Sequence, residues 1–343
     1  MKTQLSDNDV QQMLRIASGA TLGFTISKAM DWPNPIFFTL YPILLLGLVA
    51  DLNGHIIRQF LAATVFPAMV VLVVYGLFGT HPLLITPLIA ATFAFLFWQM
   101  SKGTLFLFGA FSLVGLSLQL HFASYSNDGI DIYPLVISNI GAILLALAIA
   151  FVLHLIFPDR APRTPPPRVS KDQTSIRHEV ILCTTVATLS FAVFQTFDLV
   201  DSISAQAASV LILFPLCWKG ATMSGWQRAI GTLIGCNLAL LAQLVLLNYS
   251  DTLFFASFSL WILVFFISRQ HVLNGGGAGT GFGVLTTFGI LYGQSLSPQQ
   301  DIIYSALYRF SSVVIAIVLS LCAIFVVHGL LNKYQSTRHH TFS

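Results

Sequence analysis

The chain has 343 residues, of which 56% are hydrophobic and only 8% are charged, and its net charge is +3. An ordinary soluble domain has roughly 25% charged residues, so this composition excludes a soluble globular protein and predicts an integral membrane protein with several spans. The sequence has no basic block that could follow a phosphate backbone, which excludes nucleic-acid binding.

The first residues, MKTQLSDNDVQQ, are polar and include two aspartates. They lack the pattern of a cleavable signal peptide, so we expect the first helix to insert and to remain. Apolar runs then recur along the chain, and each predicts a membrane-spanning helix. The predicted fold class is therefore an all-α integral membrane protein with about twelve transmembrane helices. The expected spans are 14–30, 35–50, 58–78, 82–99, 103–122, 132–157, 178–197, 203–219, 228–247, 252–268, 276–296 and 302–331.

The distribution of basic residues predicts the orientation, because lysine and arginine collect on the cytoplasmic side of a membrane. With a cytoplasmic N-terminus, every lysine and arginine except Lys28 and Arg309 falls in a cytoplasmic segment or at a cytoplasmic helix end. The segments expected outside, such as SYSNDGID and FDLVDS, are acidic or neutral. Both termini are therefore predicted to be cytoplasmic.

One long polar segment, rich in proline and basic residues, divides the chain. Its composition predicts an extended cytoplasmic linker rather than a folded domain. The predicted parts are a first six-helix membrane half at 1–157, the linker at 158–177, a second half at 178–331 and a cytoplasmic tail at 332–343.

The two halves are weakly similar, and their matching positions keep one constant separation. Arg58 matches Arg228 near the start of each third span, and Asp131 matches Asp301 just before each sixth span. Six is an even number of crossings, so both halves enter the membrane in the same direction. The sequence therefore predicts two parallel six-helix repeats, related by an axis along the membrane normal.

The stretch NGGGAGTGFG, residues 274–283, resembles a phosphate-binding loop at first sight. No lysine follows it and no strand–turn–helix unit surrounds it, so we exclude a nucleotide site. Gly275, Gly279 and Gly283 recur every four residues, which predicts a bare helix face for close helix packing. The alternative is a broken or mobile helix that lines a transport path.

Arg309 is the candidate with the clearest functional meaning. It lies eight residues into the last expected span, about 12 Å from Asp301 and near the bilayer midplane. A charge there is costly and must face protein or water. Arg309 either binds or gates an anion, or forms a structural ion pair. Asn139 occupies the equivalent position of the first half, which predicts a polar site near the pseudo-symmetry axis.

Other polar residues have weaker claims. Lys28 either binds substrate near the outer surface or extends to the interface and pairs with Asp31. His154 and His328, near the inner ends of the sixth and twelfth spans, could relay protons. Further polar residues in or near spans are expected to hold helices together: Gln119, His121, Gln195 and Gln243.

The sequence shows no catalytic or metal-binding pattern. It has no H-E-x-x-H motif, no paired His/Cys ligands and no nucleophile elbow. The four cysteines lie in apolar runs and are expected to be buried hydrophobic residues. We therefore expect neither an enzyme nor a bound metal or cofactor.

The third span of the second half carries R-A-I-G-T-L-I-G, with Arg228 at the cytoplasmic mouth and Gly231, Thr232 and Gly235 on one helix face. This pattern resembles the fusaric acid resistance and aromatic acid exporter family, as does D-W-P-N-P-I-F-F before the second span. In the first half, Q-F-L-A-A-T after Arg58 departs from the motif. The chain also lacks the large cytoplasmic domains of longer members.

The resemblance implies an efflux permease of the bacterial inner membrane. Its substrates would be small aromatic or amphipathic organic acids and toxic hydrophobic compounds, and its partner a periplasmic adaptor of the membrane-fusion type. The chain contains no ATP-binding domain, so a membrane gradient is the expected driving force. The oligomeric state stays open, a homo-oligomer included.

Two alternatives are kept. The segment G-L-V-A-D-L-N-G, residues 47–54, has the G-x-x-x-D-x-x-G spacing of the major facilitator signature but lacks its basic residues. A non-transporting membrane scaffold subunit is the other alternative. A closed salt bridge at Arg309 with no cavity beside it would favour the scaffold.

Overall fold

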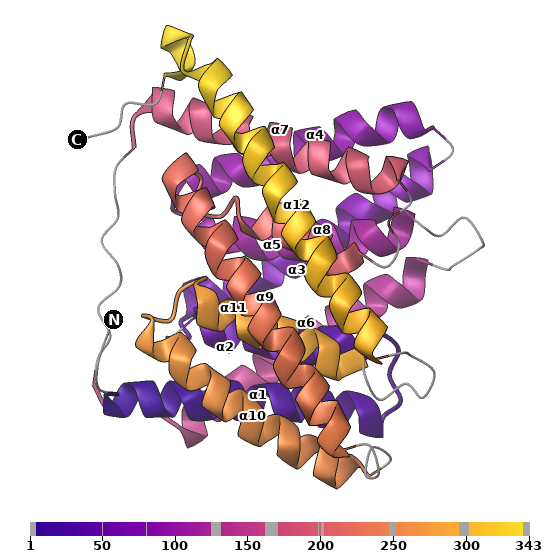
Figure 1. The fold of residues 1–343 in the computed structure, drawn as a ribbon, viewed down its shortest axis with the longest axis vertical. Coiled ribbons are helices and arrows are strands. Elements are labelled where there is room, and N and C mark those ends of the chain that lie inside the picture. Colours follow the sequence, from indigo (N-terminus) through magenta and orange to yellow (C-terminus); the bar gives the residue numbers. More distant parts are fainter. Residues whose placement is uncertain are drawn as a thin grey trace. The chain divides into compact units, whose positions relative to one another are not determined.

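The computed structural model describes residues 5–49, 51–79, 81–124, 132–161, 171–197, 199, 202–246, 252–294 and 302–338. Within these ranges the chain forms α-helices and one short 3₁₀ helix, and no strand. The predicted all-α membrane class is confirmed. The helices are α1 Asp7–Ala29, α2 Pro35–Leu48, α3 Gly54–Phe78, α4 Pro82–Lys102, α5 Phe106–Ser124, α6 Ile132–Ile156, α7 Gln173–Thr196, α8 Ile203–Leu211, α9 Trp218–Leu246, α10 Leu253–Leu273, α11 Thr280–Gln294, α12 Ile302–Leu331 and η2 Gln335–Thr337 (Figure 1).

Eight of the described helices are long and apolar enough to cross a membrane: α3, α4, α5, α6, α7, α9, α10 and α12. The helices α2 and α11 are apolar but shorter. At 1.5 Å per residue, the 14 residues of α2 extend about 21 Å, less than a bilayer core of about 30 Å. The class is therefore established, whereas the number of twelve spans stays a prediction.

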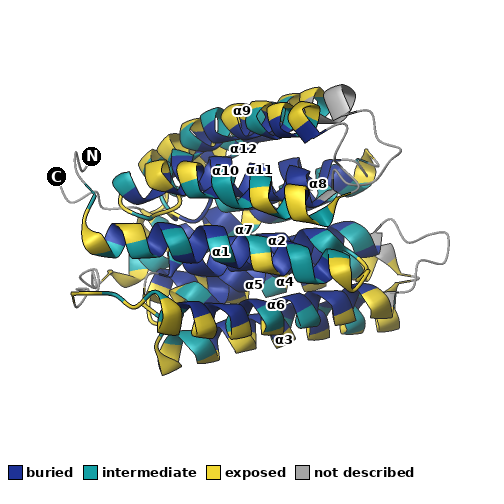
Figure 2. Cartoon of the chain, turned by 90° about the horizontal axis from the view of Figure 1, so that it is seen from below, coloured by how far each residue is buried: buried dark blue, intermediate teal, exposed yellow. Residues whose placement is uncertain are grey.

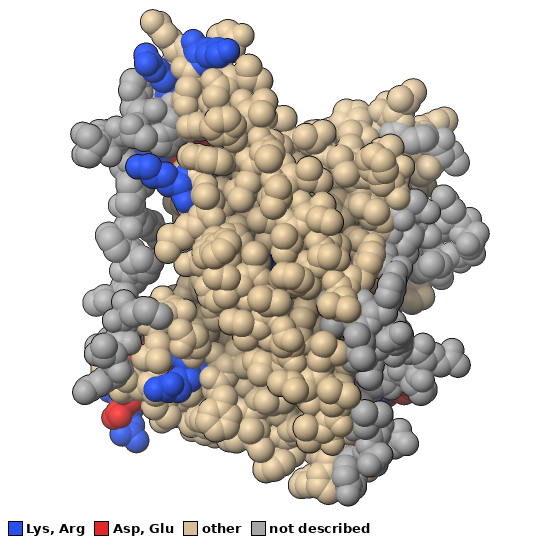
Figure 3. All heavy atoms as spheres, in the orientation of Figure 1, with Lys and Arg blue, Asp and Glu red and all other residues tan. Residues whose placement is uncertain are grey.

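The exposed faces of the long helices are apolar, as a lipid-facing surface requires. On α3, side chains spaced by four residues are exposed in one stripe: Leu61, Val65, Met69, Val73 and Leu77. Figure 2 shows exposed residues along one side of α3 and of α9, with buried residues on the other side. The face of the molecule in Figure 3 is uncharged over most of its described area.

The starts of corresponding helices in the two halves lie 164 to 174 residues apart, and the sixth pair matches the predicted separation. The sixth helices begin at Ile132 and Ile302, which are as far apart in the sequence as Arg58 and Arg228. The acidic pair Asp131 and Asp301 lies outside the described residues. The third helix of the second half differs from its expected span, because α9 begins at Trp218 rather than at Arg228. A helix continues past the apolar segment wherever its residues favour helix, since backbone hydrogen bonds do not require a bilayer.

The chain forms two compact units, and each takes helices from both sequence halves. Unit 1 comprises residues 1–57, 137–164 and 226–311, and unit 2 comprises 58–136, 165–225 and 312–343. In unit 1, α1 packs on α2 and α10, and α2 packs on α11. In unit 2, α7 packs on α8 and α4, and α8 packs on α5.

Each unit therefore combines the first two helices of one half with the fourth and fifth helices of the other. The same four helix positions make equivalent contacts in both units. One unit boundary, between residues 164 and 165, falls within the sequence-based linker 158–177, but the two units do not follow the two sequence halves, and α7 begins within that linker, at Gln173. The division into sequence halves stays a prediction about the repeat.

Candidate functional site

Unit 2 has a polar interior where α5 packs on α8. The His121 Nδ1 and the Gln206 Oε1 lie 2.7 Å apart, and both side chains are buried. Because an amide oxygen can only accept a hydrogen bond, His121 Nδ1 carries the hydrogen. The pair joins the two helices by a directional contact in a buried region.

Gln119, two residues earlier on α5, is fully buried. Neither its amide nitrogen nor its amide oxygen has a hydrogen-bond partner among the described residues. The hydroxyls of Ser112 and Ser117 on the same helix are also without a partner there. Leaving one such group unsatisfied costs about 1–3 kcal/mol.

α8 is a short helix, and the backbone that follows it is irregular. The helix has nine residues and ends at Leu211, and the chain then turns before α9 begins at Trp218. Leu216 in this turn has a positive φ of 60°, which is unusual for a residue with a side chain. Irregular backbone at membrane depth is tolerated only inside protein or beside a cavity, and it accompanies binding sites in many transporters.

The equivalent positions of unit 1 are apolar. Gly289 is the repeat equivalent of Gln119, and a Cβ there would stand 2.6 Å from the Cδ1 of Ile43 on α2. Leu291 stands where unit 2 has His121, and Ile36 where it has Gln206. These repeat positions are thus polar in unit 2 and apolar in unit 1, where Gly289 packs closely against α2.

Within unit 1, α9 and α11 approach closely through glycines. A Cβ on Gly231 would stand 2.9 Å from both the Gly283 Cα and the Thr280 carbonyl oxygen. A Cβ on Gly235 would stand 2.9 Å from the Thr287 Cβ. Three of the predicted packing glycines, Gly231, Gly235 and Gly283, therefore lie at one helix contact.

Polar groups border this contact. Arg228 Nη1 donates to Thr286 Oγ1 at 2.7 Å, and the arginine is buried. Its Nε has no hydrogen-bond partner within the described part of the chain. Thr232 Oγ1 accepts a long hydrogen bond of 3.5 Å from Thr287 Oγ1. The predicted motif residues of the third span thus face α11.

The predicted glycine stripe 275/279/283 does not exist as one helix face. α11 begins only at Thr280, and Gly275 and Gly276 have φ values of 93° and 70° in the turn after α10. A Cβ on Gly275 would meet nothing within 4 Å, and one on Gly279 would only touch Gln227 at 3.8 Å. Glycines with positive φ terminate helices readily, so these residues end α10 instead of extending α11.

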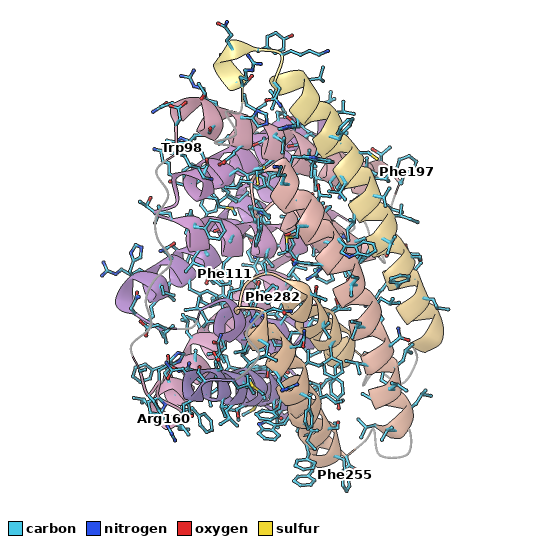
Figure 4. The ribbon with its side chains drawn as sticks, turned by 60° about the vertical axis from the view of Figure 1, so that its left-hand side comes forward. Trp98, Phe111, Arg160, Phe197, Phe255 and Phe282 are labelled. Carbon is cyan, nitrogen blue, oxygen red and sulfur yellow. The ribbon has the colours of Figure 1, made fainter. Side chains whose placement is uncertain are left out.

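Gly281, which is not part of the 275/279/283 stripe, makes a close contact. A Cβ there would stand 2.5 Å from the His271 Cα. The ring of Phe282, labelled in Figure 4, lies 5.8 Å from the His271 ring. The start of α11 therefore packs against the end of α10.

The four predicted polar site residues lie on four different helices of unit 1: Lys28 on α1, Asn139 on α6, Arg228 on α9 and Arg309 on α12. Asn139 is fully buried on α6 and accepts a hydrogen bond from the Tyr41 hydroxyl, while its Nδ2 has no partner among the described groups. Arg309 is buried on α12 and interacts with neighbouring groups. Lys28 lies half-buried in the last turn of α1 and forms no ion pair with Asp31.

Sequence reasoning treated His121 and Gln119 only as contacts between helices, and it missed Gln206. The available signal was a glutamine within the small-residue run SISAQAASV, which includes most of α8. No group of three or more His, Cys, Asp or Glu side chains in the described part of the chain could hold a metal ion.

Two family models match the chain, each over a separate range of residues. Residues 184–323 match the model of the family described as "Fusaric acid resistance protein-like". The second half is fusaric acid resistance protein-like. Residues 12–153 match a family described as "Protein of unknown function (DUF2955)". No curated protein and no solved structure gives a significant match.

The fusaric acid resistance protein-like match covers α9 with its Arg228 motif, α11 and most of α7 and α12. The resemblance noted from residues 228–235 is therefore confirmed. It indicates a multi-pass membrane protein whose second half is similar to a transport-related family. The match favours this family over the major facilitator alternative.

Proposed function

We propose that this chain is an efflux permease of a bacterial inner membrane that exports small aromatic or amphipathic organic acids and related hydrophobic compounds. The family match supports transport as the general function. The observation that carries the proposal is Gln119, a fully buried carboxamide with neither polar atom bonded among the described residues. It lies on the same helix as His121 of the His121–Gln206 pair.

A carrier of organic acids has to replace the hydration of a carboxylate or hydroxyl group inside a dry interior. A glutamine side chain offers two N–H donors and a carbonyl acceptor, so it can bind either group. In this proposal, the Gln119 side chain of unit 2 binds the polar end of the substrate.

Four further residues have proposed roles in the same process. Arg309 and Asn139, both in unit 1, hold anionic or polar groups of the substrate at a step separate from its binding by Gln119, and Arg228 acts near the cytoplasmic mouth of α9. Lys28 contributes near the outer surface. A membrane gradient drives export, and a periplasmic adaptor carries the substrate onward; both termini are cytoplasmic. The proposal assigns no chemical reaction, cofactor or metal to the chain.

The substitution Gln119→Leu tests the proposal. We expect cells that express this variant to accumulate a radiolabelled aromatic acid several-fold more than cells with the wild-type chain at equal membrane levels. The matched control is Gln243→Leu in α9, the same change at another glutamine within a span.

The thermal stability of the purified variant separates a binding role from a structural one. Removing a polar group that has no partner should leave stability unchanged or raise it by about 1–3 kcal/mol. Lost export in a protein of undiminished stability supports the site. Unchanged export would exclude Gln119 from it, and export of no organic acid by the wild type would favour the scaffold alternative.

A further inference from the structure

A chain of hydrogen bonds ties the end of α12 and the segment after it to the start of α7, all within unit 2. His178 Nδ1 lies 2.7 Å from the Thr337 carbonyl oxygen, and His178 Nε2 lies 2.9 Å from His328 Nδ1. Asn332 Nδ2 lies 3.0 Å from His328 Nε2. His178 is buried, and its contacts with Thr337 and His328 are partly buried.

The Thr337 carbonyl oxygen at one end determines the donor-to-acceptor direction of this hydrogen-bond chain. A carbonyl only accepts, so His178 Nδ1 carries a hydrogen and donates to Thr337. In a neutral His178 ring, Nε2 is then the acceptor, and His328 Nδ1 must be the donor. His328 Nε2 in turn accepts from the Asn332 amide. Every group in the chain is satisfied when both rings are neutral.

Protons affect this arrangement in two distinct steps. A first proton can be taken up at His328 Nε2, because rotation of the Asn332 amide would present its oxygen as an acceptor. A second proton has to bind His178 Nε2, where the hydrogen of His328 Nδ1 already points. Two N–H groups would then face each other at 2.9 Å on two cations. The hydrogen-bond chain therefore persists after one ring is protonated and breaks when both rings are protonated.

The described charged groups around the pair are engaged elsewhere or exposed. Glu179, the residue after His178, accepts from Lys171 Nζ at 2.8 Å with both oxygens and from Ser101 Oγ at 2.6 Å. On the adjacent α4, Lys102 lies over the ring of Trp98. Other charged residues nearby in sequence are exposed: Arg177, Asp172, Lys333 and Arg338.

Unit 1 has an equivalent contact without an imidazole, although carboxylate ion pairs lie beside it, Asp7 with Arg160 and Asp159 with Arg15. Asn8, the repeat equivalent of His178, donates through Nδ2 to the Ala161 carbonyl oxygen at 2.8 Å. Its Oδ1 accepts from the Arg160 backbone nitrogen at 2.8 Å. In both repeats, a side chain near the start of the first helix thus holds the segment that follows the sixth helix. Only the second repeat uses imidazoles for it.

We propose that His178 and His328 form a proton-operated latch, which holds the segment after α12 on α7 while at least one ring is neutral and releases it when both are protonated. Histidine is the side chain that titrates between about pH 5 and 8, so the latch responds to moderate acidification.

The latch also regulates export, and this part of the inference rests on the proposed function and topology. A weak organic acid that enters the cell releases its proton in the cytoplasm. Cytoplasmic acidification would open the latch and free the end of α12, the helix that carries Arg309. Entry of the transported acids into the cell would thus open the latch.

Spin labels at Gln335→Cys and Gln173→Cys, in a chain without its native cysteines, measure the latch directly. Both positions are exposed and lie in unit 2. At pH 8 we expect one narrow short-distance population by pulsed electron paramagnetic resonance. At about pH 5 that population should be lost, because the released form can bind a proton on each imidazole whereas the latched form cannot, and it should return when the pH is raised.

Two variants test the histidines. His328→Asn keeps a donor at the Nδ1 position and leaves one ring to titrate, so the short distance should persist at both pH values. His178→Ala should lose the short distance at both. The control is His339→Gln with His340→Gln, which removes other imidazoles of the tail and should open with acid like the wild type.

Either of two results would overturn the latch. One is a wild-type distance distribution that is the same at pH 8 and pH 5. The other is loss of the short distance in acidified His328→Asn. Efflux of an aromatic acid at acidic and neutral cytoplasmic pH is measured separately. A working latch in a chain without export would contradict the proposed function and leave the latch in place.

Discussion

Gly231 of α9 and Gly283 of α11 lie so close that a Cβ on the first would stand 2.9 Å from the Cα of the second. Such a distance is shorter than side chains tolerate, and the opposing atoms are backbone, which cannot rotate away. Close approach of this kind is how glycines hold membrane helices together. The contact joins the third and fifth helices of the fusaric acid resistance protein-like half.

Gly231→Ala should therefore destabilise the protein by roughly 1–3 kcal/mol through overpacking. Gly329→Ala is the matched control, because a Cβ at that helical position meets nothing within 4 Å. In the control, alanine should leave stability unchanged or raise it by up to about 1 kcal/mol. Thermal unfolding in detergent provides the measurement, and equal melting temperatures of the two variants would contradict the close contact.

Neighbouring glycines before and within α11 should behave differently. Gly281→Ala places a Cβ 2.5 Å from the His271 Cα, whereas Gly279→Ala only touches Gln227 at 3.8 Å. We expect a loss of folded yield for the first variant and near-normal yield for the second. The amount of monodisperse protein after size-exclusion chromatography compares them. Equal damage at both positions would mean that residue 279 lies in the packed helix after all.

Arg309 is expected to matter for charged substrates more than for neutral ones. Its planar guanidinium can hold a carboxylate through two parallel hydrogen bonds, which lysine cannot reproduce. Export of an aromatic acid should fall with Arg309→Lys and fall further with Arg309→Ala, while a neutral hydrophobic substrate is affected less. Accumulation of each radiolabelled compound at matched membrane levels gives the result. Equal export by wild type and Arg309→Ala would assign the arginine to structure alone.

The proposed topology can be tested from outside the cell. Thr164→Cys in the linker should resist an impermeant thiol reagent in intact cells, because basic segments stay in the cytoplasm. Asn127→Cys, in a segment expected outside, should react. The comparison is made in a chain without its native cysteines, before and after cell lysis. Labelling of residue 164 in intact cells would reverse the orientation.

The sequence by itself determined the class of the protein and the pattern of its repeat. A membrane protein has an apolar interior and an apolar lipid-facing surface. Its content of charged residues is therefore lower than that of a soluble domain, so the membrane class follows from residue counts. Backbone hydrogen bonds within each segment make every apolar run a helix. The constant separation of corresponding positions, such as Arg58 and Arg228, was also visible, and the helix starts Ile132 and Ile302 reproduce it.

The tertiary structure alone decided which helices pack together. Helix periodicity describes the faces of one helix and contains no information about its partner, so the union of α1 and α2 with α10 and α11 could not be predicted. The same holds for individual residues. Gly275 and Gly283 follow the same sequence pattern, but the first adopts a positive φ and ends a helix, while the second lies against Gly231. Gln119 and His178 acquire their proposed roles only through what surrounds them in the fold, because burial and hydrogen-bond partners depend on residues distant in sequence.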